Sequence, residues 1–158
     1  MATEDQKKAR LMKLFNGVVF GYAKGLYDLF GDSALATVDT IGEDLIEEME
    51  HELGLEIHGE DPKAILTELA RLLEDEYGLF DDARFDIEAH EIDIFCQGCK
   101  LWHATQEILE SGAPPFHCVP MMIAEAALHK RLGKRAKFVG ITQDKEKHIC
   151  DIDFHLMD

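Results

Sequence analysis

The spacing of the apolar residues changes near Asp82, and this change constrains the fold most strongly. Before it, apolar residues recur every three or four positions, which is the period of an amphipathic helix. After it, residues 85–90 and 92–95 alternate apolar and polar side chains, which is the period of a strand. Helices first and strands later predict an α+β fold with an antiparallel sheet.

Residues 1–80 predict three helices. The second, residues 33–53, contains Gly42, where a break could fall, and the third begins at Asp61 and Pro62. The first, residues 4–30, has glycines 17, 21 and 25 at four-residue steps, which favours close packing against another helix, including that of a second copy in a homodimer. We expect one buried stripe along this first helix, formed by Leu11, Leu14, Phe15, Val18, Val19, Tyr22, Leu26 and Leu29.

Residues 81–158 predict the strand-rich part of the chain. Residues 101–110 and 119–132 are expected to be helices, separated by a loop at 111–115. Strands at 138–141 and 149–154 close the chain as a hairpin, with Gly140 as a candidate bulge. A length of 158 residues suits one domain, so we expect a single α+β domain over 1–158: helices packed on a C-terminal antiparallel sheet with an inserted helix.

The charge of the chain excludes one class of function. It carries 32 acidic against 16 basic residues, a formal net charge of −16, which repels the phosphate backbone of nucleic acids. No stretch approaches the about 18 apolar residues of a membrane span, so no membrane partner is expected. The polar start does not have the pattern of a signal peptide, and we expect a cytoplasmic protein.

Four cysteines supply the clearest chemical pattern. Cys96 and Cys99 form a Cys-x-x-Cys turn around Gly98, and Cys118 and Cys150 follow on later elements. Four thiolates would suit zinc or, alternatively, an iron–sulfur cluster. Two other interpretations are open. Cys96 and Cys99 could form a dithiol redox couple, or the cysteines could simply be small buried hydrophobic residues. His103 and His117 are further candidate ligands.

The order of elements and two short motifs resemble a known family. The run 41–45 (Ile-Gly-Glu-Asp-Leu) and the final Cys-Asp-x-x-Phe at 150–154 are similar to those of the 4-vinyl reductase domain, whose archaeal members are called hydrocarbon-binding proteins. Its superfamily includes trafficking-complex subunits and haem-based nitric-oxide sensors. Residues 96–154 also resemble the L-2-amino-thiazoline-4-carboxylic acid hydrolase-like family.

The resemblance implies a homodimer and a zinc ion held by cysteines. In similar phenol-sensing regulators, one ligand opens the last helix and another lies on the last strand, which match Cys118 and Cys150 here. The family's intervening Glu-x-x-Cys is absent from this chain. Cys96 and Cys99 could replace it if their turn lies at the same edge of the sheet.

The resemblance also implies a pocket for an apolar or aromatic ligand, between the helical layer and the sheet. The side chains taken alone favour core packing over a pocket, and it is the resemblance that supports the pocket. A metal- or cysteine-dependent enzyme, either a hydrolase or a reductase, and a protein-binding adaptor with an acidic surface are the alternative functions; no catalytic residue is assigned. The candidate ligand-binding residues are Trp102, Phe116, Met121, Met122 and Phe138.

Overall fold

The computed structural model describes residues 2–157 and confirms the α+β arrangement. The first part of the chain contains helix α1 (Glu4–Phe30), the 3₁₀ helix η1 (Gly31–Ala36), α2 (Thr37–Glu47), the π-helical segment η2 (Glu48–Glu52) and α3 (Pro62–Asp75). The second part contains strands β1 (Asp82–Glu88) and β2 (Glu91–Gln97), helices α4 (Trp102–Ser111) and α5 (Val119–Leu132), and strands β3 (Arg135–Asp144) and β4 (Ile149–Met157).

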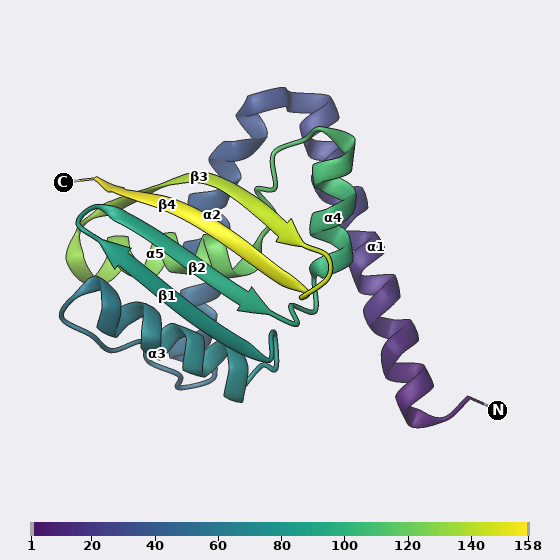
Figure 1. Ribbon diagram of the computed structural model, residues 1–158, viewed down its shortest axis with the longest axis horizontal. Helices are drawn as coiled ribbons and strands as arrows, with labels where there is room; N and C mark the ends of the chain where they lie inside the picture. Colours follow the sequence, from purple (N-terminus) through teal and green to yellow (C-terminus); the bar gives the residue numbers. More distant parts are fainter. Residues whose placement is uncertain (1, 158) are drawn as a thin grey trace.

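The last strand lies inside the sheet. The strand order is β1-β2-β4-β3 and each neighbouring pair is antiparallel, so β4 joins the two hairpins (Figure 1). The predicted bulge is confirmed, since the register of β3 shifts between Phe138 and Gly140. On the inner face, β2 and β4 place Ile92 opposite Phe154 and Ile94 opposite Ile152, all buried. Helices α3 and α5 cover this face.

The second predicted helix is divided differently from the expectation. Residues 33–53 form three segments, η1, α2 and η2, and the α-helical segment runs through Gly42 without a break. Gly42 is buried where α2 crosses α5, and a Cβ atom there would lie 2.4 Å from the carbonyl oxygen of Met122. Gly42 therefore allows α2 and α5 to approach closely. The spacing of residues in the sequence does not distinguish this role from a helix break.

The prediction that α1 buries its apolar stripe is wrong. Only Asn16 and Ala23 of this helix are buried, and Leu11, Phe15 and Tyr22 are largely exposed. The side of α1 that faces the body uses other residues: the Asn16 Nδ2 donates to the carbonyl oxygen of Lys100 (2.8 Å), and its Oδ1 accepts from the backbone N–H of Ala104 (3.0 Å). The helix thus has two apolar faces: six of the eight predicted stripe residues are on the exposed one, whereas Val19 and Leu26 are half-buried and pack against the core.

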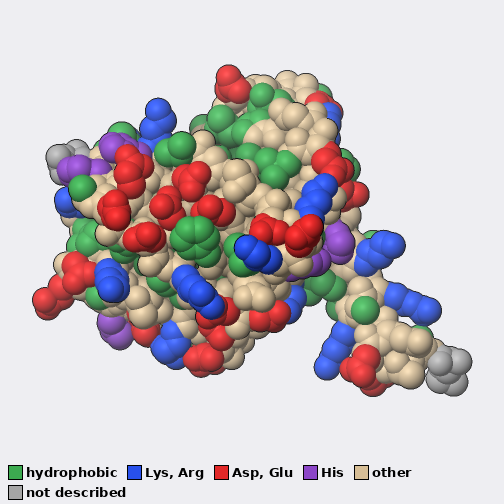
Figure 2. All heavy atoms as spheres, in the orientation of Figure 1, with side chains coloured by type: hydrophobic (Ala, Val, Ile, Leu, Met, Phe, Trp, Pro, Cys, Tyr) green, Lys and Arg blue, Asp and Glu red, His purple; other side chains and the backbone are tan. Residues whose placement is uncertain are grey.

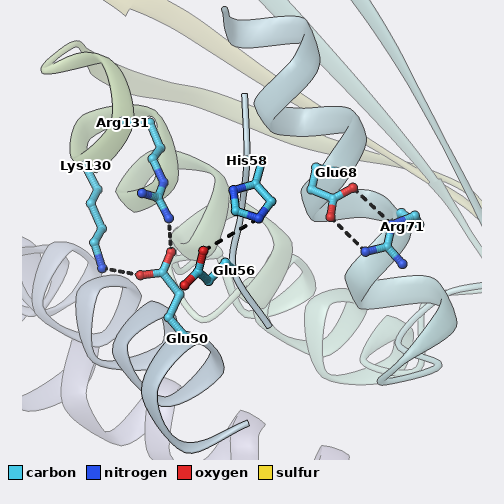
Figure 3. A network of polar contacts seen from close by, with 7 residues as sticks. All are labelled: Glu50, Glu56, His58, Glu68, Arg71, Lys130 and Arg131. Atoms are coloured by element: carbon cyan, nitrogen blue, oxygen red, sulfur yellow. Dashed lines mark hydrogen bonds and ion pairs between the residues drawn. The ribbon is translucent and has the colours of Figure 1, made fainter. Parts of the chain in front are cut away.

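Glu50 joins η2 to the end of α5 (Figure 3). Its carboxylate accepts from Lys130 Nζ at 2.6 Å and also binds Arg131. Burial raises the pKa of Glu50, but the hydrogen bond from Lys130 and the charges of both cations outweigh it and hold the pKa below its usual value. The pair of contacts holds η2 against α5.

The outer face of the sheet carries a row of aspartates, as the alternation predicts. Register places Asp86 opposite Asp93, and Asp93 opposite Asp153, across three neighbouring strands. Figure 2 shows acidic side chains gathered over this face. Partial burial, with repulsion from Asp153 and Asp86, raises the pKa of Asp93. Like charges directly opposite one another destabilise a sheet.

We expect Asp93→Asn to stabilise the fold at neutral pH by about 0.5 kcal/mol, since it removes one charge from the row. Because the folded-state pKa of Asp93 is raised, repulsion destabilises the fold above that pKa and disappears as pH falls through it. The gain should therefore shrink in urea unfolding measured at acidic pH. Asp44→Asn, on the exposed side of α2, is the control and should show neither effect.

Candidate functional site

The structure brings the four cysteines together at one end of the sheet. Cys96 on β2 and Cys150 on β4 are direct register partners, so both side chains point to the inner face. Cys99 lies in the turn after β2, where Gly98 has a φ of 69° and donates its N–H to the carbonyl oxygen of His148 (3.0 Å). Cys118 is the residue that precedes α5, with extended backbone.

Burial governs the chemistry of these thiols. All four are buried and free, and burial raises the pKa of each; it does so strongly for Cys96 and Cys118, and for Cys99 to about 11. The neighbouring thiols raise the pKa of Cys96 further, which reflects how close the cluster is. Thiols held neutral in this way are poor nucleophiles and poor redox partners.

The cluster supplies soft sulfur donors, which suit zinc or an iron–sulfur cluster. However, among residues 2–157 no three or more His, Cys, Asp or Glu side chains form a group able to hold a metal ion. Metal binding would require the thiols to rotate and lose their protons. The metal site of Cys96, Cys99, Cys118 and Cys150 therefore stays a prediction.

Gln143 and Trp102 lie against the cluster. The Nε2 of Gln143 donates to the carbonyl oxygen of Trp102 (3.2 Å) and to the Sγ of Cys150 (3.5 Å). The Trp102 ring stacks on that of His148, with centroids 4.7 Å apart. These contacts connect the start of α4 to the β3–β4 hairpin beside the thiols.

The two candidate histidine ligands lie in different surroundings. His103 is exposed on α4. His117 is buried, and its Nε2 is 3.3 Å from the Thr105 hydroxyl. Its Nδ1 has no hydrogen-bond partner among residues 2–157, and burial lowers the pKa of His117 to about 4. His117 is thus a neutral side chain at neutral pH.

Because burial raises the pKa of Cys99 from its ordinary value of 9.0 to about 11, its thiolate fraction at neutral pH falls roughly a hundredfold. We expect Cys99 of the folded protein to react about a hundredfold more slowly with a thiol-specific disulfide reagent than in denaturant, and the other three thiols also to react more slowly than in denaturant. Stopped-flow absorbance would measure this. One rapidly reacting thiol in the folded chain would contradict the burial of the cluster.

The residues predicted to line a ligand pocket are mainly core residues. Trp102, Phe116, Met121 and Met122 are buried in the main apolar cluster. Phe138 is half-buried in the wall of a hollow between α2, α5 and β3, most of whose other lining side chains are charged. Their ligand-binding role stays a prediction that the packing does not favour.

A different apolar hollow lies within the helical layer. It has a volume of about 170 Å³ and was not predicted from the sequence, because its lining comes from five separate segments. Burial, and then the charge of Glu48, raises the pKa of the Tyr77 hydroxyl in its wall. Met49 belongs to η2, and π-helical segments occur often at functional sites. The lining consists of Leu45, Glu48, Met49, Leu73, Tyr77, Leu79, Val119 and Ile123.

The hollow adjoins the cysteine cluster through the backbone. Val119, in its wall, directly follows Cys118. The carbonyl oxygen of Leu79, also in its wall, accepts from the N–H of Lys100 at 2.8 Å, and Lys100 directly follows Cys99. A backbone shift at the cysteine cluster would therefore move the wall of the hollow. Cys118 acts directly on Val119, and Cys99 acts on Leu79 through the hydrogen bond from Lys100.

Comparisons with known proteins add little to this geometry. No protein-family model and no curated protein matches the chain. Similar solved structures include the Fe(II) unliganded H-NOX protein from K. algicida (10% identity, TM-score 0.45) and a mutant of an H-NOX protein from the same source (11% identity, TM-score 0.44). Each alignment covers 79% of this chain and 64% of the other. Across residues 2–157, no helix is long and apolar enough to cross a membrane.

Proposed function

We propose that the protein binds a small apolar or aromatic molecule in the hollow between α2, η2, α3 and α5. The observation that carries the proposal is the lining: six of its eight side chains are aliphatic or methionine, and one hydroxyl and one carboxylate lie in the same wall. Small-molecule sites in proteins combine a mostly apolar wall with a few polar groups in this way.

The size of the hollow indicates the class of ligand. A buried apolar cavity of about 150 Å³ accepts benzene. At about 170 Å³, this hollow suits one aromatic ring or a short branched alkane. The hydroxyl of Tyr77 and the carboxylate of Glu48 could bind a single polar substituent, so a phenol is a reasonable probe.

We also propose that the four cysteines hold a metal ion, with zinc first and an iron–sulfur cluster as the alternative. Cys118 would join the start of α5 to the central strands through Cys96 and Cys150, and Cys99 would fix the turn. Metal held there would stabilise the wall of the hollow through Val119 and Leu79. Neutral buried thiols give no support to the alternative of a cysteine nucleophile.

The ligand proposal predicts that toluene or phenol raises the melting temperature of the full chain. At one hundred times Kd, a ligand that binds only the folded state adds about 2.7 kcal/mol. Leu45→Trp fills the hollow and should abolish the shift, since Leu45 is one of its wall residues. Differential scanning fluorimetry and isothermal titration calorimetry measure both effects.

Leu53→Trp is the matched control for that variant. Leu53 is 53% exposed directly after η2 and is not part of the wall, so this variant should keep the ligand shift. If Leu53→Trp loses the shift as completely as Leu45→Trp, the ligand binds elsewhere. The pocket proposal fails if neither probe stabilises the original chain.

The metal proposal predicts that protein purified without oxygen contains about one zinc per chain and is colourless. Cys118→Ser should lower its melting temperature by about 5 °C or more before chelation, and by much less after chelation. Elemental analysis and scanning calorimetry measure these values. A brown protein containing iron would favour the iron–sulfur cluster. A metal-free protein whose melting temperature is unchanged by Cys118→Ser would rule out both metals.

A further inference from the structure

The end of the β3–β4 hairpin, residues 143–148, covers one side of the cysteine cluster. Gln143 is half-buried, and its Nε2 donates to the Sγ of Cys150 at 3.5 Å, so its amide lies directly against a thiol. The elements that carry the thiols, strands β2 and β4 and the start of α5, belong to the core. Residues 144–148, in contrast, are all exposed. A movement of the hairpin end would therefore uncover thiols without disturbing the core.

Contacts with two neighbouring segments hold the hairpin end in place. Figure 1 shows it beside the start of α4 and the end of β2. The ring of His148 stacks on that of the buried Trp102, with centroids 4.7 Å apart. The carbonyl oxygen of His148 accepts from the N–H of Gly98, in the Cys-x-x-Cys turn, at 3.0 Å. Lys145 forms an ion pair with Glu110 of α4 at 3.2 Å, but both side chains are exposed, so this pair adds little.

The hairpin end lacks the buried contacts that hold the rest of the sheet. Residues 144–148 are Asp-Lys-Glu-Lys-His and bury no aliphatic side chain. The carboxylate of Asp144 accepts from the N–H groups of Glu146 and Lys147, so the turn can keep its own shape when it moves. Segments with few buried apolar contacts open at a lower free energy than the fold as a whole. The hairpin end meets that description, whereas β2, β4 and α5 do not.

His148 is the residue on which the closed position depends most. Its φ of 55° lies in the left-handed region, which is uncommon for residues other than glycine. Such a conformation persists where the surrounding contacts hold it in place. Here Trp102 holds the ring and the N–H of Gly98 holds the carbonyl oxygen. Loss of the stack therefore removes one of the two restraints on this residue.

We propose that the hairpin end is a lid over the cysteine cluster, which His148 and Gln143 hold closed and whose opening admits small molecules and ions to the thiols. Opening separates the two stacked rings, releases the N–H of Gly98 and moves the Gln143 amide away from Cys150. Cys150 and Cys99 are the first thiols exposed, since Gln143 covers one and Gly98 directly precedes the other. For a metal ion the lid is the route of entry, and this part alone rests on the proposed metal site.

Hydrogen exchange of the Gly98 N–H measures the opening directly. His148→Asn removes the stacked ring, and asparagine is among the residues that adopt the left-handed backbone of this position most often. NMR of the full chain should show this N–H exchanging about three- to tenfold faster in the variant, which is the effect of losing one aromatic pair. Glu146→Ala is the matched control and should keep the original rate. Glu146 is exposed in the same turn, and within residues 2–157 its side chain forms no hydrogen bond or ion pair.

Timed labelling with iodoacetamide, followed by mass spectrometry, shows which thiols the lid covers. Gln143→Leu keeps a side chain of similar size but loses both of its hydrogen bonds. In this variant and in His148→Asn, Cys150 and Cys99 should be labelled about three- to tenfold faster than in the original chain, and before Cys118. Low concentrations of urea should leave these rates almost unchanged, since local opening exposes little surface. Circular dichroism should show all three variants folded.

An unchanged exchange rate of the Gly98 N–H in His148→Asn would overturn the lid. So would labelling of all four thiols at one rate that climbs steeply with urea, because the reagent would then reach them through unfolding of the whole chain. Elemental analysis decides the metal proposal separately. Exchange of the Gly98 N–H needs no metal, so a chain without zinc can still show the lid. A zinc-containing chain whose variants exchange this N–H at the original rate keeps the metal site and loses the lid.

Discussion

The pairing of β2 with β4 is the constraint on which the rest of the structure depends. It joins the β1–β2 hairpin to the β3–β4 hairpin and so connects the middle of the chain to its end. Its register fixes the inner apolar face, and the same register places Cys96 opposite Cys150. If β4 slipped by one residue along β2, Cys150 and the buried Ile152 would turn to the acidic outer face, while Cys96 would stay on the inner one.

Helix α5 connects the paired strands to the helical layer. Cys118 precedes its first residue, Val119 and Ile123 line the hollow, and its end binds Glu50 of η2. The cysteine cluster, the hollow and the ion pairs of Glu50 with Lys130 and Arg131 (Figure 3) thus share this helix. This common support is the physical reason to expect that metal binding and ligand binding influence each other.

Local patterns in the sequence predicted the elements that depend on local physics. The bounds of α5 agree with the expected residues 119–132, because Pro120 and Gly133 begin and end it. The alternation in residues 149–154 predicted a strand and its buried side. The first helix shows the limit: its period revealed an apolar face, but the structure packs a different side, which includes Asn16 and Ala23, against the body and leaves most of the predicted face exposed.

The sequence by itself determined the α+β class, the tight turn at Gly98 and the chemistry of four thiols. Those depend on residue type and on spacing within a few positions. Only the tertiary structure decided that Cys118 and Cys150 lie beside that turn, and that Leu45, Leu73 and Val119 enclose one hollow. Such groupings arise where helices cross and strands pair, and contacts between residues distant along the chain leave no periodic pattern in the sequence.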